Sequence, residues 1–170
     1  MAINDDPIRQ VSHEAFPVDN PVLALLRDHD LVRKLADKYR NSDSAEVKKQ
    51  AAIQLVQAIN MHSRLEESVF YPGVRRVEPN LIAHFEEEHL AVDDILATLQ
   101  GMSMDDPAAA PLVDEMLDSV LAHIDEEEKQ FFPQLQHAAI DMTPIGLEMQ
   151  AFEANMVHLQ AQMSDQGARR

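Results

Sequence analysis

The sequence predicts an all-α protein, an up-down-up-down four-helix bundle followed by an additional helix. The composition favours helices over a sheet protein full of tight turns, because the chain has only four glycines and no tryptophan. Apolar residues recur at helical spacing in four long segments that are joined by mostly short links. Four helices connected in this way are typical of a bundle in which chain neighbours pack antiparallel.

The four predicted bundle helices have recognisable start and stop residues. They cover residues 20–40, 45–71, 81–99 and 112–132. Asn20-Pro21 predicts an N-cap followed by proline at the first helical position. Pro72-Gly73 marks the end of the second helix, and Gly101 and Pro111 mark a longer connection before the fourth.

The chain divides into three parts around this bundle. Residues 1–19 are expected to form an N-terminal arm, and residues 20–135 the bundle. Residues 141–165 form an amphipathic stretch that we expect to pack on the bundle as the additional helix, followed by a frayed end. A length of 170 residues fits one such domain.

Charge and composition exclude several classes of function. The chain has 14 Lys and Arg against 30 Asp and Glu, a formal charge of -16, which repels phosphate backbones and anionic membranes. We therefore expect no nucleic-acid partner and no membrane partner. No apolar run is long enough to span a membrane or to direct secretion, so a cytoplasmic protein is expected. With no cysteine, any metal site must use nitrogen and oxygen ligands.

An internal repeat gives the strongest indication of function. Residues 62–72 and 123–133 both follow the pattern HxxxEExxF(Y/F)P. A further histidine precedes each copy, His29 by 33 residues and His89 by 34. The chain is therefore two related helical hairpins, which bring equivalent residues together at the centre of a bundle.

Six residues of the repeat are candidate metal ligands. A histidine and a glutamate four residues later project from the same face of a helix, and the second and fourth helices each supply such a pair. The two preceding histidines lie on apolar stripes, so all six side chains should point inward: His29, His62, Glu66, His89, His123 and Glu127. Burying these groups is costly unless a divalent metal compensates for the lost water.

The other histidines do not fit this arrangement. A single histidine on an apolar stripe is more often a hydrogen-bonded core residue than a ligand, and only the repetition favours metal. His84 lies about 140° around the helix from His89 and should face solvent. His13, His137 and His158 lack a carboxylate at helical spacing and are expected at the surface.

The ligand types narrow the choice of metal. Four imidazoles and two carboxylates suit iron, zinc, manganese or nickel and disfavour calcium and magnesium. Six side chains leave two ions short of ligands, whereas structural zinc normally has a closed shell of four. Open positions on a redox metal in a dry core are what binding of O2, NO or peroxide requires.

The ordered pattern H, HxxxE, H, HxxxE with its EExxF(Y/F)P segments resembles the hemerythrin-like, or HHE cation-binding, family over residues 20–135. The resemblance implies two non-haem iron ions with an oxo or hydroxo bridge, for which zinc, manganese or nickel could substitute. It also implies that Glu66 and Glu127 bridge the ions and that the four histidines are terminal ligands.

The sequence departs from the oxygen-carrying members of that family. Phe85 stands where those carriers have a further histidine, which leaves one iron less saturated and disfavours reversible oxygen carriage. The carriers also place the last carboxylate five residues after its histidine, which would select Glu128, whereas the internal repeat selects Glu127. Glu86, one turn before His89, is a further alternative ligand.

Four functions are consistent with these residues. The first is a di-iron protein that binds or senses O2, NO or peroxide. The alternatives are a peroxide-disproportionating enzyme, an iron-handling or iron-sensing protein, and a metal-free helical interaction module. No general acid/base dyad, nucleophile or phosphate loop is found, so an enzyme is not the first expectation.

Overall fold

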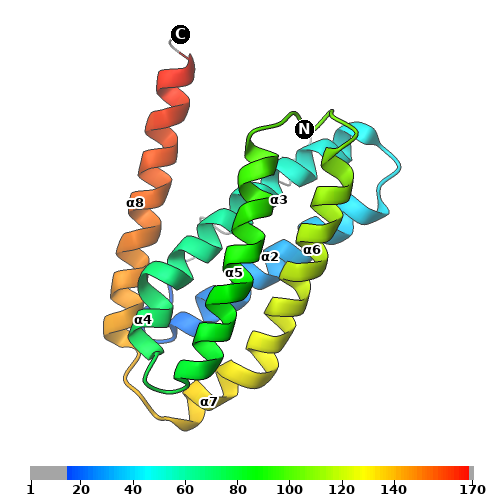
Figure 1. The fold of residues 1–170 in the computed structure, drawn as a ribbon. Coiled ribbons are helices and arrows are strands. Elements are labelled where there is room, and N and C mark those ends of the chain that lie inside the picture. The colour runs from blue at the N-terminus through cyan, green and yellow to red at the C-terminus, as the bar shows by residue number, and fades with distance from the viewer. Residues whose placement is uncertain (1–14, 169–170) are drawn as a thin grey trace, which may run out of the picture.

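Four helices form the bundle in the computed structural model, which describes residues 15–168 (Figure 1). They are α2 (Pro21–Asn41), α3 (Ala45–Leu65), α5 (Pro79–Gln100) and α6 (Ala109–Glu126). Each packs against its chain neighbour, and α2 and α6 also meet, which closes the ring. The described residues contain no strand, so the predicted all-α fold is confirmed. None of the described helices has the length and the apolar content needed to cross a membrane.

The helix starts agree largely with the sequence signals. Ser44 caps α3, where its hydroxyl oxygen accepts a hydrogen bond from the backbone N–H of Val47 at 3.3 Å. Pro21 lies in the first turn of α2, but the side chain of Asn20 makes no capping hydrogen bond. Pro111, expected in the connection, lies in the first turn of α6, where no helical N–H is needed.

Each copy of the repeat contains one turn of π-helix. These turns are η1 (Glu66–Phe70) and η2 (Glu127–Phe131), followed by α4 (Tyr71–Val74) and α7 (Phe132–His137). The backbone N–H groups of Tyr71 and Phe132 each donate to the carbonyl oxygen five residues earlier. Pro72 and Pro133 come next and have no N–H to donate, so the wider turn carries the helix past them. The prolines therefore do not end the helices.

The bundle interior has two apolar clusters with a polar layer between them. The upper cluster in Figure 1 lies towards the α2–α3 and α5–α6 links and includes Leu35 and Leu55. The lower cluster includes Phe70 and Phe131 of the π turns. Along α5, for example, His89 of the layer lies between Phe85 of the lower cluster and Val92 of the upper cluster. A polar layer at this depth must be internally compensated.

Helix α8 (Thr143–Ala168) packs on the bundle through its first half only. Met149 is fully buried there, and Gly146 lies so close to the segment before α2 that an added Cβ would come within 2.0 Å of the carbonyl oxygen of Val18. The second half stands away from the bundle (Figure 1) and exposes Leu159 and Met163. This helix continues beyond the predicted residue 165. Most of the predicted arm, residues 1–14 with His13, lies outside the described residues.

Candidate metal centre

The six residues selected from the repeat come together in the polar layer. The exposed fraction of each is between 0% and 7%. They come from four helices and two π turns: His29, His62, Glu66, His89, His123 and Glu127. The structure therefore brings together every residue of the predicted set.

The donor atoms of these residues form two groups that share one carboxylate. The first donor group is His29, His62, Glu66 and Glu127, and the second donor group is Glu66, His89 and His123. Within each group the donor atoms all lie within 4.8 Å of one another. Because Glu66 belongs to both groups, one of its oxygens faces each group.

Most distances agree with this division, although Glu127 Oε2 of the first group also lies 3.2 Å from His123 Nε2 of the second. Glu66 Oε1 lies 3.0 Å from His62 Nε2, and Glu66 Oε2 lies 3.1 Å from His89 Nε2. The two Nε2 atoms of His29 and His62 are 3.2 Å apart, and those of His89 and His123 are 3.1 Å apart. The imidazole nitrogens of each pair are so close that they would repel one another if both were protonated. They suit a shared cation instead.

Several buried oxygens have no hydrogen-bond partner among the described residues. Those at the centre are both carboxylate oxygens of Glu127 and Oε1 of Glu66. Both carboxylates are fully buried. An unpaired buried carboxylate oxygen is costly, whereas metal coordination satisfies it. The donor set of nitrogen and oxygen atoms and these unpartnered oxygens therefore fit a pair of metal cations.

Each of the four histidines is held from behind by a carboxylate. In the neutral ring, Nδ1–H donates to the carboxylate and leaves the lone pair of Nε2 directed at the centre. Asp28 accepts from His62 at 3.0 Å and Glu88 from His123 at 2.6 Å; Glu67 accepts from His89 at 3.1 Å and Glu128 from His29 at 2.9 Å. We call these four acids the outer carboxylates: Asp28, Glu67, Glu88 and Glu128.

The outer carboxylates repeat the internal symmetry of the sequence. Asp28 and Glu88 each precede a ligand histidine and bond a histidine of their own repeat. Glu67 and Glu128 each follow an inner glutamate and bond a histidine of the other repeat. The sequence alone did not reveal this role, although each outer carboxylate stands next to one of the six inner residues in the chain.

Two arginines hold two of the outer carboxylates. Arg33 binds both oxygens of Glu128, at 2.9 and 2.8 Å. Arg64 lies 3.2 Å from Glu67 and 2.6 Å from Asp93. A bidentate arginine fixes the plane of a carboxylate and so fixes the orientation of the imidazole that it bonds.

Burial and the charges of their neighbours shift the pKa values of the buried histidines and glutamates. Burial and the neighbouring His62 lower the pKa of His29 to about 4. Burial opposes protonation of His62, but Glu66 and Asp28 outweigh it and raise its pKa well above the usual value. Burial and the nearby charge of Glu66 raise the pKa of Glu127 to about 8. A metal ion entering this site must displace protons.

One position breaks the symmetry of the two donor groups. Tyr71 and Phe132 occupy equivalent places in the repeat. The hydroxyl of Tyr71 donates to Glu66 Oε2 at 3.0 Å and lies 3.4 Å from Nε2 of both His89 and His123. Phe132 instead stacks on the ring of His29, with ring centres 5.8 Å apart. The second donor group therefore has a phenol oxygen beside it and the first has none.

A small cavity of about 20 Å³ adjoins both donor groups. Its wall includes the rings of His62, His89 and His123, and most of the rest is aliphatic: Val32, Ile59, Val92, Val120 and Ile124. A space of this size holds about one water-sized molecule. It is thus a place where a small uncharged molecule could reach the centre.

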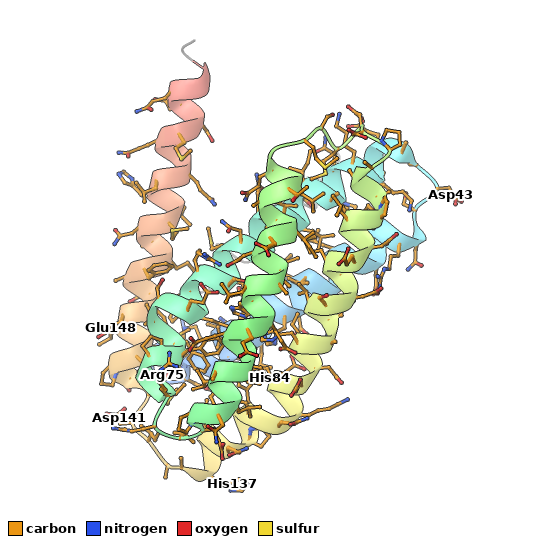
Figure 2. All side chains as sticks on the ribbon, in the orientation of Figure 1. Asp43, Arg75, His84, His137, Asp141 and Glu148 are labelled. Carbon is orange, nitrogen blue, oxygen red and sulfur yellow. The ribbon has the colours of Figure 1, made fainter. Side chains whose placement is uncertain are left out.

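The alternative ligands lie elsewhere. Glu86 pairs with Arg75 at 2.5 Å and belongs to neither donor group. Glu128 is an outer carboxylate, whereas Glu127, which the internal repeat selected, belongs to the first donor group. His84, labelled in Figure 2, is 47% exposed at its side chain and lies 3.3 Å from Glu126. His137 and His158 are exposed, as predicted.

Known proteins that are similar to this chain have the same fold and belong to a cation-binding family. Over 143 residues it is 31% identical to an uncharacterised hemerythrin-like protein of Schizosaccharomyces pombe, which covers 80% of this chain and 68% of that protein. The crystal structure of a hemerythrin HHE cation binding domain-containing protein from Mycobacterium kansasii matches the fold with a TM-score of 0.62 at 19% identity, over 85% of this chain and 91% of that one. The model of the hemerythrin HHE cation binding domain matches residues 20–135, and the chain belongs to this family.

Proposed function

We propose that the chain holds two non-haem iron ions in the two donor groups and binds O2, NO or peroxide there. One observation carries the proposal: two groups of buried nitrogen and oxygen donors share Glu66 and adjoin a small, mainly aliphatic cavity. The first ion would be held by His29, His62, Glu66 and Glu127, and the second by Glu66, His89 and His123.

The donor set and its open positions support a redox-active metal such as iron over zinc. Imidazole and carboxylate together suit iron, zinc and manganese, and disfavour the all-oxygen shells of calcium and magnesium. Three or four protein donors per ion leave room for an exogenous ligand on a six-coordinate metal. Iron would supply the redox chemistry at such an open position, which zinc lacks.

The residues around the ions would prepare the site for a small neutral ligand. The outer carboxylates hold each imidazole with Nε2 directed inward, so the site needs little reorganisation when metal enters. The mainly aliphatic wall favours small ligands that carry little hydration, such as O2, NO and peroxide. A cytoplasmic location, the absence of a nucleic-acid partner and a peroxide-disproportionating activity stay predictions.

Metal analysis and ligand titration test the proposal. Freshly purified protein is expected to contain close to two irons per chain, and its near-ultraviolet absorption should change on adding NO, azide or peroxide. His62→Ala should lower the iron content, whereas His137→Ala, at an exposed histidine outside both groups, should leave it unchanged. A metal-free protein that takes up no iron, or iron spectra that no small ligand alters, would contradict the proposal.

A further inference from the structure

We propose that the phenol oxygen of Tyr71 is a fourth protein ligand of the second ion, bound as phenolate to ferric iron. The inference rests on the proposed function, because it needs a metal in the second donor group. It extends the six-residue site by one residue that the repeat alone does not indicate, since the equivalent position in the other copy is Phe132.

The geometry of four atoms carries the inference. Tyr71 is fully buried, and its oxygen lies 3.0 Å from Glu66 Oε2 and 3.4 Å from each Nε2 of His89 and His123. The other three separations among these atoms are 3.1, 3.1 and 3.9 Å. The four atoms are therefore the corners of a slightly irregular tetrahedron.

The size of this tetrahedron matches a metal site. A metal with bonds of about 2.0–2.1 Å to four ligands at tetrahedral corners separates those ligands by roughly 3.3 Å. All six separations found here lie between 3.0 and 3.9 Å. A phenol that served only to bond Glu66 would have no reason to be equidistant from two imidazole nitrogens.

The comparison of the two donor groups supports the same assignment. The first group has four protein donors without any contribution from Phe132. The second has three, and only one of them is a carboxylate, which it shares with the first group. Tyr71 brings the second group to four donors and adds an anionic ligand, which suits a ferric ion.

The π turn places the phenol at this point. Glu66 begins η1 and Tyr71 follows its last residue, so one wide turn separates the shared carboxylate from the phenol. When metal binds, the O–H bond of Tyr71 breaks, its proton passes to the solvent buffer, and an oxygen–metal bond forms. No electron is transferred in this step.

The tyrosine content of the chain makes the test specific. The chain has two tyrosines, Tyr39 and Tyr71, and no tryptophan. Loading with gallium(III), a redox-inert substitute for ferric iron, should produce an ultraviolet difference spectrum equal to one ionised phenol per chain. Loading with ferric iron should add a visible phenolate-to-iron charge-transfer band.

Two variants assign the signals. Tyr71→Phe should remove both signals and weaken binding of the second ion at least about tenfold, the lower bound found even for outer partners of metal ligands. Tyr39→Phe is the matched control, because Tyr39 lies in the upper apolar cluster, away from the donor groups, and both signals should persist. If Tyr71→Phe does not fold, the wild-type signals and the Tyr39→Phe control still decide.

The possible results separate this inference from the proposed function. A wild-type protein with two ions and no phenolate signal would overturn the role of Tyr71 and leave the proposed function standing. A phenolate signal that survives in Tyr71→Phe would likewise overturn it. A wild-type protein that binds neither gallium nor iron would contradict the proposed function itself.

Discussion

The two halves of the site are alike on the outside and different on the inside. In both repeats an acid before a histidine and an acid after a glutamate hold the imidazoles from behind. At the centre, Tyr71 adds an oxygen to one half, while Phe132 adds only a ring to the other. The outer carboxylates orient the four imidazoles, so we expect substitutions of these acids to be poorly tolerated. This inner position is one place where the two donor groups differ.

Removing metal should have the largest effect, and it tests both halves at once. Without ions, the unpartnered oxygens of Glu66 and Glu127 remain buried. A ligand present at about a thousand times its dissociation constant stabilises a protein by about 4 kcal/mol. For a chain of this size that corresponds to roughly 10 °C in melting temperature. Calorimetry before and after chelation measures it, and an unchanged melting temperature would show that metal does not compensate for these charges.

Replacing the two inner glutamates should separate the halves. Glu66 belongs to both donor groups, whereas Glu127 belongs to the first and reaches only His123 of the second. Glu66→Gln should therefore reduce the metal content to well below one ion per chain, while Glu127→Gln should leave about one. Metal analysis of both purified variants makes the comparison. Equal losses in the two variants would mean that the groups are not separate ion positions.

Neutralising the outer carboxylates should show how similar the halves are. Asp28→Asn and Glu88→Gln occupy equivalent places and should each weaken metal affinity about 10–100-fold, because an oriented and more basic imidazole is lost. Asp118→Asn, at a side chain that is 76% exposed and pairs with Arg40, is the control and should have no effect. Competition with a coloured chelator gives the affinities. An effect in only one half would break the outer symmetry.

The smallest expected effect is the dependence of metal affinity on pH. The pKa of Glu127 is raised to about 8, so in the metal-free protein this carboxyl is protonated at neutral pH and an ion must displace the proton. Affinity should therefore rise between pH 6 and 8 and change less above that range. In Glu127→Gln one fewer proton is released, so the rise should be shallower. Affinity that falls as pH rises would contradict this assignment of charge.

The helices and the six inner residues could be predicted because the signals are local. A histidine and a glutamate four residues apart share a face whatever surrounds them, and the repeat related the two halves. The histidine–carboxylate pairs could not be predicted, because they join residues 22 to 99 positions apart and depend on how neighbouring helices are aligned. The outer acids stood beside the ligands in the sequence, but adjacency along a helix does not reveal which imidazole each one bonds.

Tyr71 is a further residue whose contacts could not be predicted from the sequence. In the repeat pattern it was grouped with Phe132 as one aromatic position, and apolar packing is the usual role of such residues. Only the π turn, which carries the helix past Pro72, and the distances to two histidines reveal the role of its hydroxyl. One oxygen atom distinguishes Tyr71 from Phe132 at equivalent places in the two halves.

Anomalous diffraction from crystals of the iron-loaded protein tests directly whether each donor group holds one ion. We expect two anomalous peaks about 3.5–4 Å apart. One should lie among His29, His62 and Glu127 and the other among His89, His123 and Tyr71, with Glu66 between them. A single peak, or peaks outside the polar layer, would contradict it.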